Sequence, residues 1–199
     1  PSLQGGAGAS QTQEGNSADR AGDQLVDQAP EDGGPQDAAV QEKALNWENA
    51  ALEQAVREAA GIPDGDITAA DLEQVTYLDL SNAGIKDLSV LNWFPALTSV
   101  DLTGNGIRDL TPLSGLTQLE GLCLDENQIT DLMPLRNMTS LQRLYLENNQ
   151  ISNLMPLTTL TGLTQLYLED NQITDISPLE GLTGLGILHL GGNRIQDIK

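Results

Sequence analysis

A repeat of 22 residues constrains this chain more than any other feature of its sequence. From Val75 onward, apolar side chains return at relative positions 1, 4, 6, 11, 14, 17 and 20 of each repeat. The later repeats begin at aligned leucines, which are Leu97, Leu119, Leu141, Leu163 and Leu185. Repetition of this length is typical of a solenoid, in which each repeat forms one coil and stacks on its neighbours. We therefore expect one apolar core that extends along the stack.

The first half of each repeat predicts a short strand followed by an inward bend. Positions 4 and 6 are apolar and alternate with polar residues, so stacked coils would pair their strands into a parallel sheet with one buried face. Asparagine at position 9 is expected to satisfy backbone groups at the bend, and it occurs as Asn105, Asn127, Asn149, Asn171 and Asn193. The first repeat has Ala83 instead, so we expect a looser or shifted turn there.

The second half of each repeat predicts a 3₁₀ or short α-helical turn. Proline at position 16 suits the start of such a turn because its φ is fixed and it lacks an N–H, and it occurs as Pro112, Pro134, Pro156 and Pro178. Position 13 is expected to supply turn acceptors and holds Asp87, Asp109, Asp131, Asn153, Asp175 and Asp197. The sequence thus predicts an α/β solenoid, a curved array with a parallel sheet on its concave side and 3₁₀ or short helices on its convex side.

Residues 44–74 predict an α-helical N-terminal cap. An apolar stripe that includes Leu52 and Val56 indicates a helix, with Asn46 as its expected N-cap. A second short helix is expected after Thr68. An array of coils exposes the apolar edge of its first coil, and a helical segment before the array would cover that edge.

The stretch Asp64–Asp71 is similar to the second half of an EF-hand calcium loop. Aligning Asp71 with the last ligand position puts Ala60 and Ile62 where carboxylate ligands should stand. Too few oxygen ligands would converge to bind calcium. We therefore interpret the stretch as a turn and a helix cap.

Composition constrains the chemistry of a partner. Residues 1–43 are polar and have no apolar period, so we expect a disordered acidic tail. The whole chain has 29 acidic and 9 basic side chains, a formal net charge of −20. Binding to nucleic acid or to an anionic membrane needs a surplus of basic residues, which this chain lacks. No apolar stretch of about 18 residues exists, so no transmembrane helix is predicted.

The repeats resemble those of the internalin type of bacterial leucine-rich-repeat (LRR) protein, which read N-x-I-x-D-I-x-P-L. Residues Asn171–Leu179 carry this motif, and the resemblance covers residues 75–199. It implies a secreted or surface-attached bacterial protein that binds a host, matrix or cell-wall partner. The same period also occurs in intracellular regulators of protein phosphatases, so a cytoplasmic regulatory scaffold is the alternative. The shared residues are the scaffold and do not identify the partner.

A partner is expected on the outward positions 3, 5 and 7 of the concave sheet. Tyr145 and Tyr167 are neighbours at position 5, Arg143 stands at position 3, and His189 continues the column. Exposed tyrosine and arginine are typical of binding hot spots. Positions 7 and 8 add an acidic edge that would attract a basic protein or peptide, formed by Asp125, Glu126, Glu147, Glu169 and Asp170. Two alternatives stay open, namely that the tyrosines only cover the sheet and that the acids only keep the protein soluble.

Catalysis and cofactors are not expected. Cys123 and His189 share position 5 but lie three coils apart, about 14 Å at 4.8 Å per strand, too far for a catalytic pair. The carboxylates of Glu147 and Glu169 would lie on an open surface, which does not separate their pKa values as a cleft would. One cysteine and one histidine leave little for a zinc site. The sequence therefore predicts a monomeric binding protein that is not an enzyme and holds no metal.

The last repeat stops at Lys199, before its Pro-Leu segment. A solenoid that ends on Leu188 and Leu190 would expose an apolar edge, so we expect the natural protein to be longer. A structural spacer that presents a missing domain is therefore a third hypothesis for the function.

Overall fold

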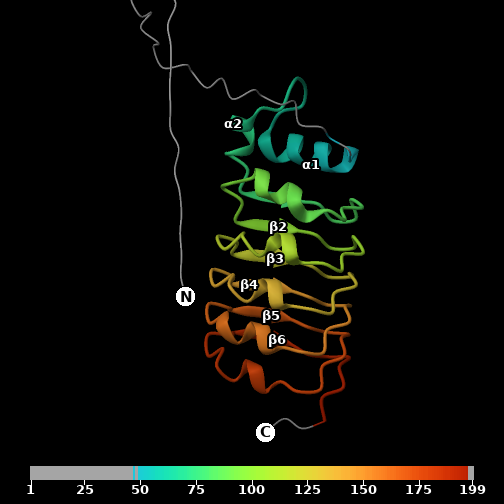
Figure 1. The fold of residues 1–199 in the computed structure, drawn as a ribbon, viewed down its shortest axis with the longest axis vertical. Coiled ribbons are helices and arrows are strands. Elements are labelled where there is room, and N and C mark those ends of the chain that lie inside the picture. The colour runs from blue at the N-terminus through green and yellow to red at the C-terminus, as the bar shows by residue number, and fades with distance from the viewer. Residues whose placement is uncertain (1–46, 48, 197–199) are drawn as a thin grey trace, which may run out of the picture. The chain divides into compact units, whose positions relative to one another are not determined.

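The computed structural model describes residue 47 and residues 49–196, and it shows two α-helices followed by stacked coils (Figure 1). The helices are α1 (Ala50–Ala60) and α2 (Ala69–Leu72). The strands are β1 (Tyr77–Asp79), β2 (Ser99–Asp101), β3 (Gly121–Cys123), β4 (Arg143–Tyr145), β5 (Gln165–Tyr167) and β6 (Ile187–His189). The 3₁₀ helices are η1 (Leu88–Trp93), η2 (Thr111–Leu113), η3 (Met133–Leu135), η4 (Met155–Thr159) and η5 (Ser177–Leu179). The tail predicted for residues 1–43 lies outside the described residues.

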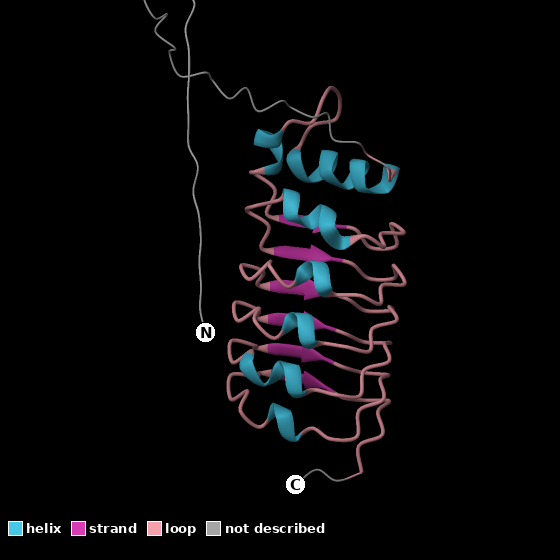
Figure 2. Ribbon diagram, viewed as in Figure 1, coloured by secondary structure: helices cyan, strands magenta, loops and turns pink. Residues whose placement is uncertain are grey.

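The strands form one parallel sheet in the order β1 to β6. Each strand pairs with the next at an offset of one repeat, so that Tyr145 lies beside Tyr167 and Leu144 beside Leu166. Parallel neighbours need a crossover connection between them. The 3₁₀ segment of each coil lies in that connection, and Figure 2 shows the strands stacked with the short helices alongside. The predicted solenoid and its parallel sheet are confirmed.

The core runs through the coils as columns of leucine and isoleucine. Leu122 and Leu124 at positions 4 and 6 are fully buried, as is Ile129 at position 11. Burying one such side chain contributes about 1.5–3 kcal/mol, so each coil is stabilised by the coils on either side. Leu188 on β6 is 39% exposed, whereas Leu166 on β5 is fully buried. The difference arises because no coil of the described residues lies beyond β6.

The asparagines at position 9 link each coil to the one before it. The Nδ2 of Asn127 donates to the carbonyls of Leu102 and Leu124, at 3.1 and 3.0 Å. Its Oδ1 accepts from the backbone N–H of Ile107 at 2.8 Å. The same three contacts recur at Asn105, Asn149, Asn171 and Asn193. The predicted role of the asparagine column is confirmed, and each amide also spans two coils.

The first coil has Ala83 at position 9, and its turn shares one feature with the other coils. Asn82 has a φ of 54°, as Asn148 does at the same position of its own coil. The carbonyl of Ala83 accepts a hydrogen bond from the Nδ2 of Asn49 at 2.9 Å. The backbone N–H of Ala83 also donates to the carbonyl of Leu80 at 3.3 Å. Gly84 has a φ of 68°, whereas Gln150 at the same position of its own coil does not have a positive φ. The turn of the first coil is therefore shifted relative to the turn at Gln150, as predicted, and the residue that precedes α1 supplies a side-chain amide to it.

On the other side of each coil, positions 13 and 16 build the 3₁₀ turn. The Oδ1 of Asp109 accepts from the N–H of Thr111 at 2.8 Å, and Pro112 lies in the first turn of η2. Asn153 accepts from the N–H of Met155 at 3.0 Å in the same way. The remaining members are Asp87, Asp131 and Asp175, which do the same, and Asp197, which lies outside the described residues. An amide serves as well as a carboxylate, so the column supplies turn acceptors as predicted.

Helix α1 contributes Leu52 and Val56 to the core of the array. Its N-cap is Asn49, whose Oδ1 accepts from the N–H groups of the first helical turn at 2.8 and 3.1 Å. The predicted N-cap, Asn46, lies outside the described residues, and the cap is instead the asparagine directly before the helix. The helix ends at Gly61, whose φ of 70° is the left-handed value that glycine adopts without a Cβ clash.

Helix α2 is capped by Asp71, whose carboxylate accepts from the hydroxyl and the N–H of Thr68, at 2.7 and 2.8 Å. These bonds lower the pKa of Asp71. The carboxylate that the calcium-loop alignment singled out therefore serves as a helix cap, as predicted. Ile67 and Leu72 are buried in the same core as Leu78 of β1. The two helices thus cover the apolar end of the array next to β1 (Figure 1).

Candidate functional site

Positions 3, 5 and 7 of the coils form the exposed face of the sheet, which we call the strand face. In β2, β4 and β5 the middle residue is buried and the residues on either side are partly exposed. Side chains alternate between the two faces of a strand, so the buried leucines of position 4 turn positions 3 and 5 outward. The 22-residue register then aligns equivalent positions in columns.

Tyr145, Tyr167 and His189 form a continuous column of rings on the strand face. The rings of Tyr145 and Tyr167 are stacked, with centroids 4.6 Å apart and planes 13° from parallel. The ring of His189 lies 4.7 Å from that of Tyr167 at an angle of 56°. The three rings are in contact in sequence along the column, so the strand face presents a continuous aromatic surface.

Polar contacts fix the surroundings of the aromatic column. The hydroxyl of Tyr145 donates to the Oε1 of Gln165 on β5, at 3.1 Å. Arg143 extends toward β3, where a Cβ built on Gly121 would lie 3.2 Å from its Nη2. The absence of a side chain at Gly121 thus leaves room for the guanidinium on the strand face. The structure places Arg143 beside the aromatic column, as the sequence predicted.

Carboxylates crowd position 7 of the strand face. Asp125 accepts a hydrogen bond from the N–H of Glu147 at 2.7 Å, and burial nevertheless raises the pKa of Asp125. The pKa of Glu147 rises to about 7, first because of burial, then because of a hydrogen bond with Glu169 and the negative charges of Asp125 and Glu169. The predicted acidic edge is present. Two of its carboxyl groups, those of Asp125 and Glu147, have pKa values above the ordinary range.

Glu147, Glu169 and His189 converge where the acidic edge meets the aromatic column. The Nδ1 of His189 lies 3.3 Å from the Oε2 of Glu169. One potential ligand atom from each of the three residues lies within 4.8 Å of the other two. The sequence led us to expect no metal site, and it did not show this convergence, because the three residues come from three different coils and two different positions of the repeat.

Glu126 and Asp170, the other two residues of the predicted acidic edge, lie in the turn after the strand. Both are exposed and have left-handed backbones, with φ values of 54° and 53°. The same position 8 is left-handed in the remaining coils, where it holds Asn82, Gly104, Asn148 and Gly192. The recurrence of glycine and asparagine in this column was the signal for that backbone conformation, and the sequence analysis missed it.

Cys123 and His189 do not form a catalytic pair. They lie on β3 and β6, and Tyr145 and Tyr167 stand between them in the same column. Burial and the negative charges of Asp101 and Asp125 raise the pKa of Cys123 to about 12. A thiol with so high a pKa contains very little nucleophilic thiolate near neutral pH.

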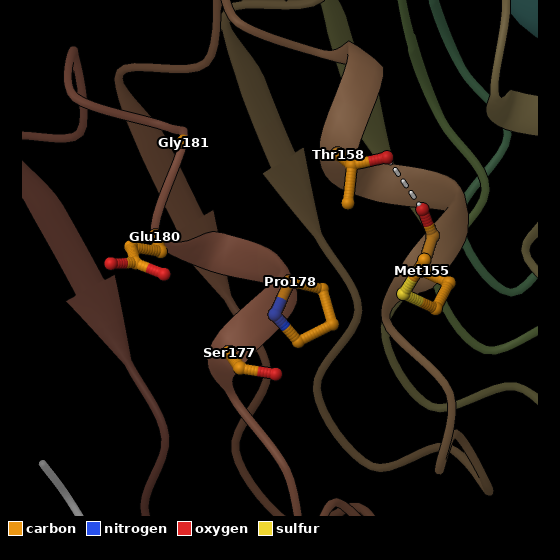
Figure 3. Close-up of a pocket in the computed structure, with 6 residues that line it drawn as sticks. All are labelled: Met155, Thr158, Ser177, Pro178, Glu180 and Gly181. Atoms are coloured by element: carbon orange, nitrogen blue, oxygen red, sulfur yellow. Dashed lines mark hydrogen bonds between the residues drawn. The ribbon is translucent and has the colours of Figure 1, made fainter.

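The 3₁₀ side of the array has a pocket of different character (Figure 3). It lies between η4 and η5 and is lined by Met155, Thr158, Ser177, Pro178, Glu180 and Gly181. The hydroxyl of Thr158 donates to the carbonyl of Met155 at 2.9 Å. Glu180 is the one ionisable side chain among the lining residues, so the pocket does not gather groups for chemistry or for recognition of charge.

Sequence comparisons identify the repeats. A model described as "Leucine Rich repeats (2 copies)" matches residues 117–160 and 161–199, and a model described as "Leucine Rich repeat" matches residues 95–110. A search of curated proteins gave no match to this sequence. The matched segments span the coils from β2 onward, which agrees with the repeat observed in the structure.

Solved structures similar to this chain include those of three bacterial proteins. Internalin C2 from Listeria monocytogenes is 32% identical with a TM-score of 0.59, and the match covers 75% of this chain and 87% of that one. The internalin InlF from the same organism is 31% identical with a TM-score of 0.69, covering 75% and 45%. An LRR protein from Leptospira interrogans is 27% identical with a TM-score of 0.55, covering 63% and 33%. This chain therefore spans less than half the length of the latter two.

The repeat, the asparagine column and the similarity to internalin C2 over most of its length agree with one another. Given the 22-residue coils and these relatives, the chain belongs to the internalin-like leucine-rich-repeat proteins.

Proposed function

We propose that this chain is a binding module that recognises another protein through its strand face. The observation that carries the proposal is the column formed by Tyr145, Tyr167 and His189, whose rings contact one another and are partly or fully exposed. Aromatic side chains that are ordered before binding lose little conformational entropy when a partner arrives. Arg143 beside the column adds hydrogen-bond donors of the kind found in binding hot spots. We propose binding rather than catalysis. The strand face offers an aromatic surface for a partner, whereas the thiol of Cys123 is too weakly ionised to act as a nucleophile.

The acidic edge favours a basic protein or peptide as the partner. Asp125, Glu147 and Glu169 lie beside the aromatic column, and the whole chain has a formal net charge of −20. A lysine or arginine of the partner would be attracted both by these carboxylates and by the faces of the tyrosine rings. The same charge repels nucleic acid and anionic lipid, so neither is part of the proposal.

We further propose that the protein acts outside the cell or on the surface of a bacterium. The support is its similarity to two internalins of Listeria monocytogenes and to an LRR protein of Leptospira interrogans. Among the described residues, no helix is long and apolar enough to cross a membrane. Protease treatment of intact cells tests the location. Digestion before lysis would support it, and protection until lysis would favour the cytoplasmic regulatory scaffold.

In this proposal residues 75–199 are the monomeric binding domain and residues 44–74 its cap. The buried side chains of Leu52 and Val56 support the assignment of the cap. Light scattering of the full chain would test the monomer, and a mass that rises with concentration would contradict it.

The test of the proposed function is capture of a partner from host and bacterial surface extracts. The wild-type chain is compared with a Tyr145→Ala/Tyr167→Ala/Glu147→Lys variant. The matched control is Met155→Ala/Thr158→Ala/Glu180→Lys, which makes two truncations and one charge reversal on the 3₁₀ side. Circular dichroism first establishes that all three chains are folded. We expect the wild type and the control to retain a partner that the strand-face variant loses. Equal capture by the two variants would reject the strand face as the binding surface.

A further inference from the structure

We propose that Glu147, Glu169 and His189 form a binding site for a divalent transition metal of the zinc class. The three residues come from successive coils: Glu147 and Glu169 lie two residues beyond β4 and β5, and His189 is the last residue of β6. This inference is independent of the proposed function, since metal binding is measured without a partner.

The geometry of the three side chains suits a small metal ion. Zinc binds imidazole nitrogen and carboxylate oxygen at about 2.0–2.2 Å, which puts neighbouring tetrahedral ligand atoms about 3.4 Å apart. The Nδ1 of His189 and the Oε2 of Glu169 are already 3.3 Å apart. The carboxylate of Glu147 completes a set in which the ligand atoms lie within 4.8 Å of one another. Small rotations of exposed side chains would complete three bonds to one ion.

The aromatic column holds the imidazole in position for such an ion. The ring of His189 lies 4.7 Å from that of Tyr167, and its Nδ1 is directed at the carboxylate of Glu169. Tyr167 is itself stacked on Tyr145. The stack therefore gives the site a support that a random pair of surface acids lacks.

The charges also favour a cation at this point. One carboxylate oxygen of Glu147 and one of Glu169 lie within 4.8 Å of each other. The salt bridges formed within residues 49–196 join Arg57 to Glu53 and His189 to Glu169. No lysine or arginine of that part of the chain therefore pairs with either glutamate. A divalent ion between them would offset the repulsion between the two carboxylates.

The donor set selects the class of metal. Calcium takes six to eight oxygen ligands and magnesium prefers oxygen alone, whereas one imidazole with two carboxylates suits zinc and its neighbours in the first transition row. Three protein ligands leave at least one position open to solvent on the strand face. A water molecule would occupy that position in the isolated chain, and a histidine or carboxylate of a partner would occupy it in a complex.

Zinc titration of the full chain tests the site. Isothermal calorimetry is run on a Cys123→Ser background, which removes the single thiol, and calcium is titrated in parallel. His189 is the single histidine of the chain, so the NMR signals of its imidazole report directly on the site. We expect one saturable zinc site, a shift of these signals with bound zinc, and no corresponding site for calcium.

Variants separate this site from unspecific binding to an acidic chain. His189→Ala and Glu147→Gln should each weaken zinc binding at least tenfold, whereas Glu180→Gln on the 3₁₀ side should leave it unchanged. These substitutions affect partly or fully exposed side chains, and circular dichroism verifies the fold. Zinc affinity that survives His189→Ala or Glu147→Gln, or imidazole signals that do not move, would overturn the proposal.

Discussion

Tyr145 and Tyr167 stack with their ring centroids 4.6 Å apart, although one complete coil separates them in the chain. This contact connects the scaffold to the candidate site. The parallel register places the two residues side by side, and the buried leucines of position 4 turn both rings outward. The aromatic surface therefore depends on the regular stacking of the coils, and variants of these tyrosines test both the scaffold and the candidate site.

The first prediction concerns the energy of this stack. Tyr145→Ala, Tyr167→Ala and the double variant form a double-mutant cycle, read from urea unfolding. We expect a coupling of about 0.5–1.5 kcal/mol, because stacked aromatic pairs contribute that much beyond their burial. Tyr77 on β1 supplies the control, since the cycle of Tyr77→Ala with Tyr145→Ala joins residues three strands apart. A Tyr145–Tyr167 coupling no larger than that of the control pair would contradict the stack.

The second prediction concerns the asparagine column. Asn127→Ala leaves the backbone N–H of Ile107 without its acceptor. It also removes one of the two asparagine donors from each of the carbonyls of Leu102 and Leu124. A buried polar group that loses its partner costs about 1–3 kcal/mol, so we expect a loss of at least that size in the free energy of unfolding. Gln150→Ala, at an exposed position, should change it by about 0.5 kcal/mol or less. Similar losses for both variants would show that the column is not a structural link.

The repeat made much of this structure predictable. Once the 22-residue period was known, the parallel register placed Tyr145, Tyr167 and His189 in one column without any information about side-chain packing. The asparagine and aspartate columns were predictable for the same reason, because one residue type at one position in every coil indicates one local role. Periodicity thus predicts the scaffold and the position of each side chain on it.

What periodicity does not predict is how unlike residues from different coils meet. Glu147 and Glu169 share position 7, but His189 belongs to position 5, and only side-chain conformations bring the three together. The cap of the first coil shows the same limit. Asn49 reaches Ala83 across 34 residues, where no repeat relates one residue to the other. Both contacts depend on side-chain reach rather than on the period.

The third prediction uses the left-handed backbone of Glu126. A side chain with a Cβ costs about 1–2 kcal/mol in this conformation, whereas glycine adopts it freely. Glu126→Gly should therefore raise the free energy of unfolding by about 0.5–1 kcal/mol, after subtraction of the entropy that glycine adds to the unfolded chain. Glu120→Gly, at an exposed residue whose φ is not positive, should lower it. Thermal unfolding of both variants decides, and a loss of stability in Glu126→Gly would contradict the argument.

The fourth prediction concerns the thiol of Cys123, whose pKa is raised to about 12 by burial and by the charges of Asp101 and Asp125. Alkylation requires the thiolate, so the rate with iodoacetamide should still rise about tenfold per pH unit between pH 8 and 10.5. A plateau near pH 9 would indicate an ordinary thiol. Asp101→Asn removes one of the nearby charges and should increase the rate at pH 8, whereas Asp131→Asn on the 3₁₀ side should not.

The central claim is that a partner contacts the strand face, and site-specific photo-crosslinking tests it most directly. A benzophenone amino acid is placed at Arg143 or Gln165 on the strand face and, for comparison, at Thr158 or Glu180 on the 3₁₀ side. Each chain is exposed to surface extracts, irradiated and examined by mass spectrometry. The account predicts the same crosslinked partner from both strand-face positions, with an excess of free wild-type chain preventing the crosslink. Crosslinks from the 3₁₀ side alone would contradict the claim.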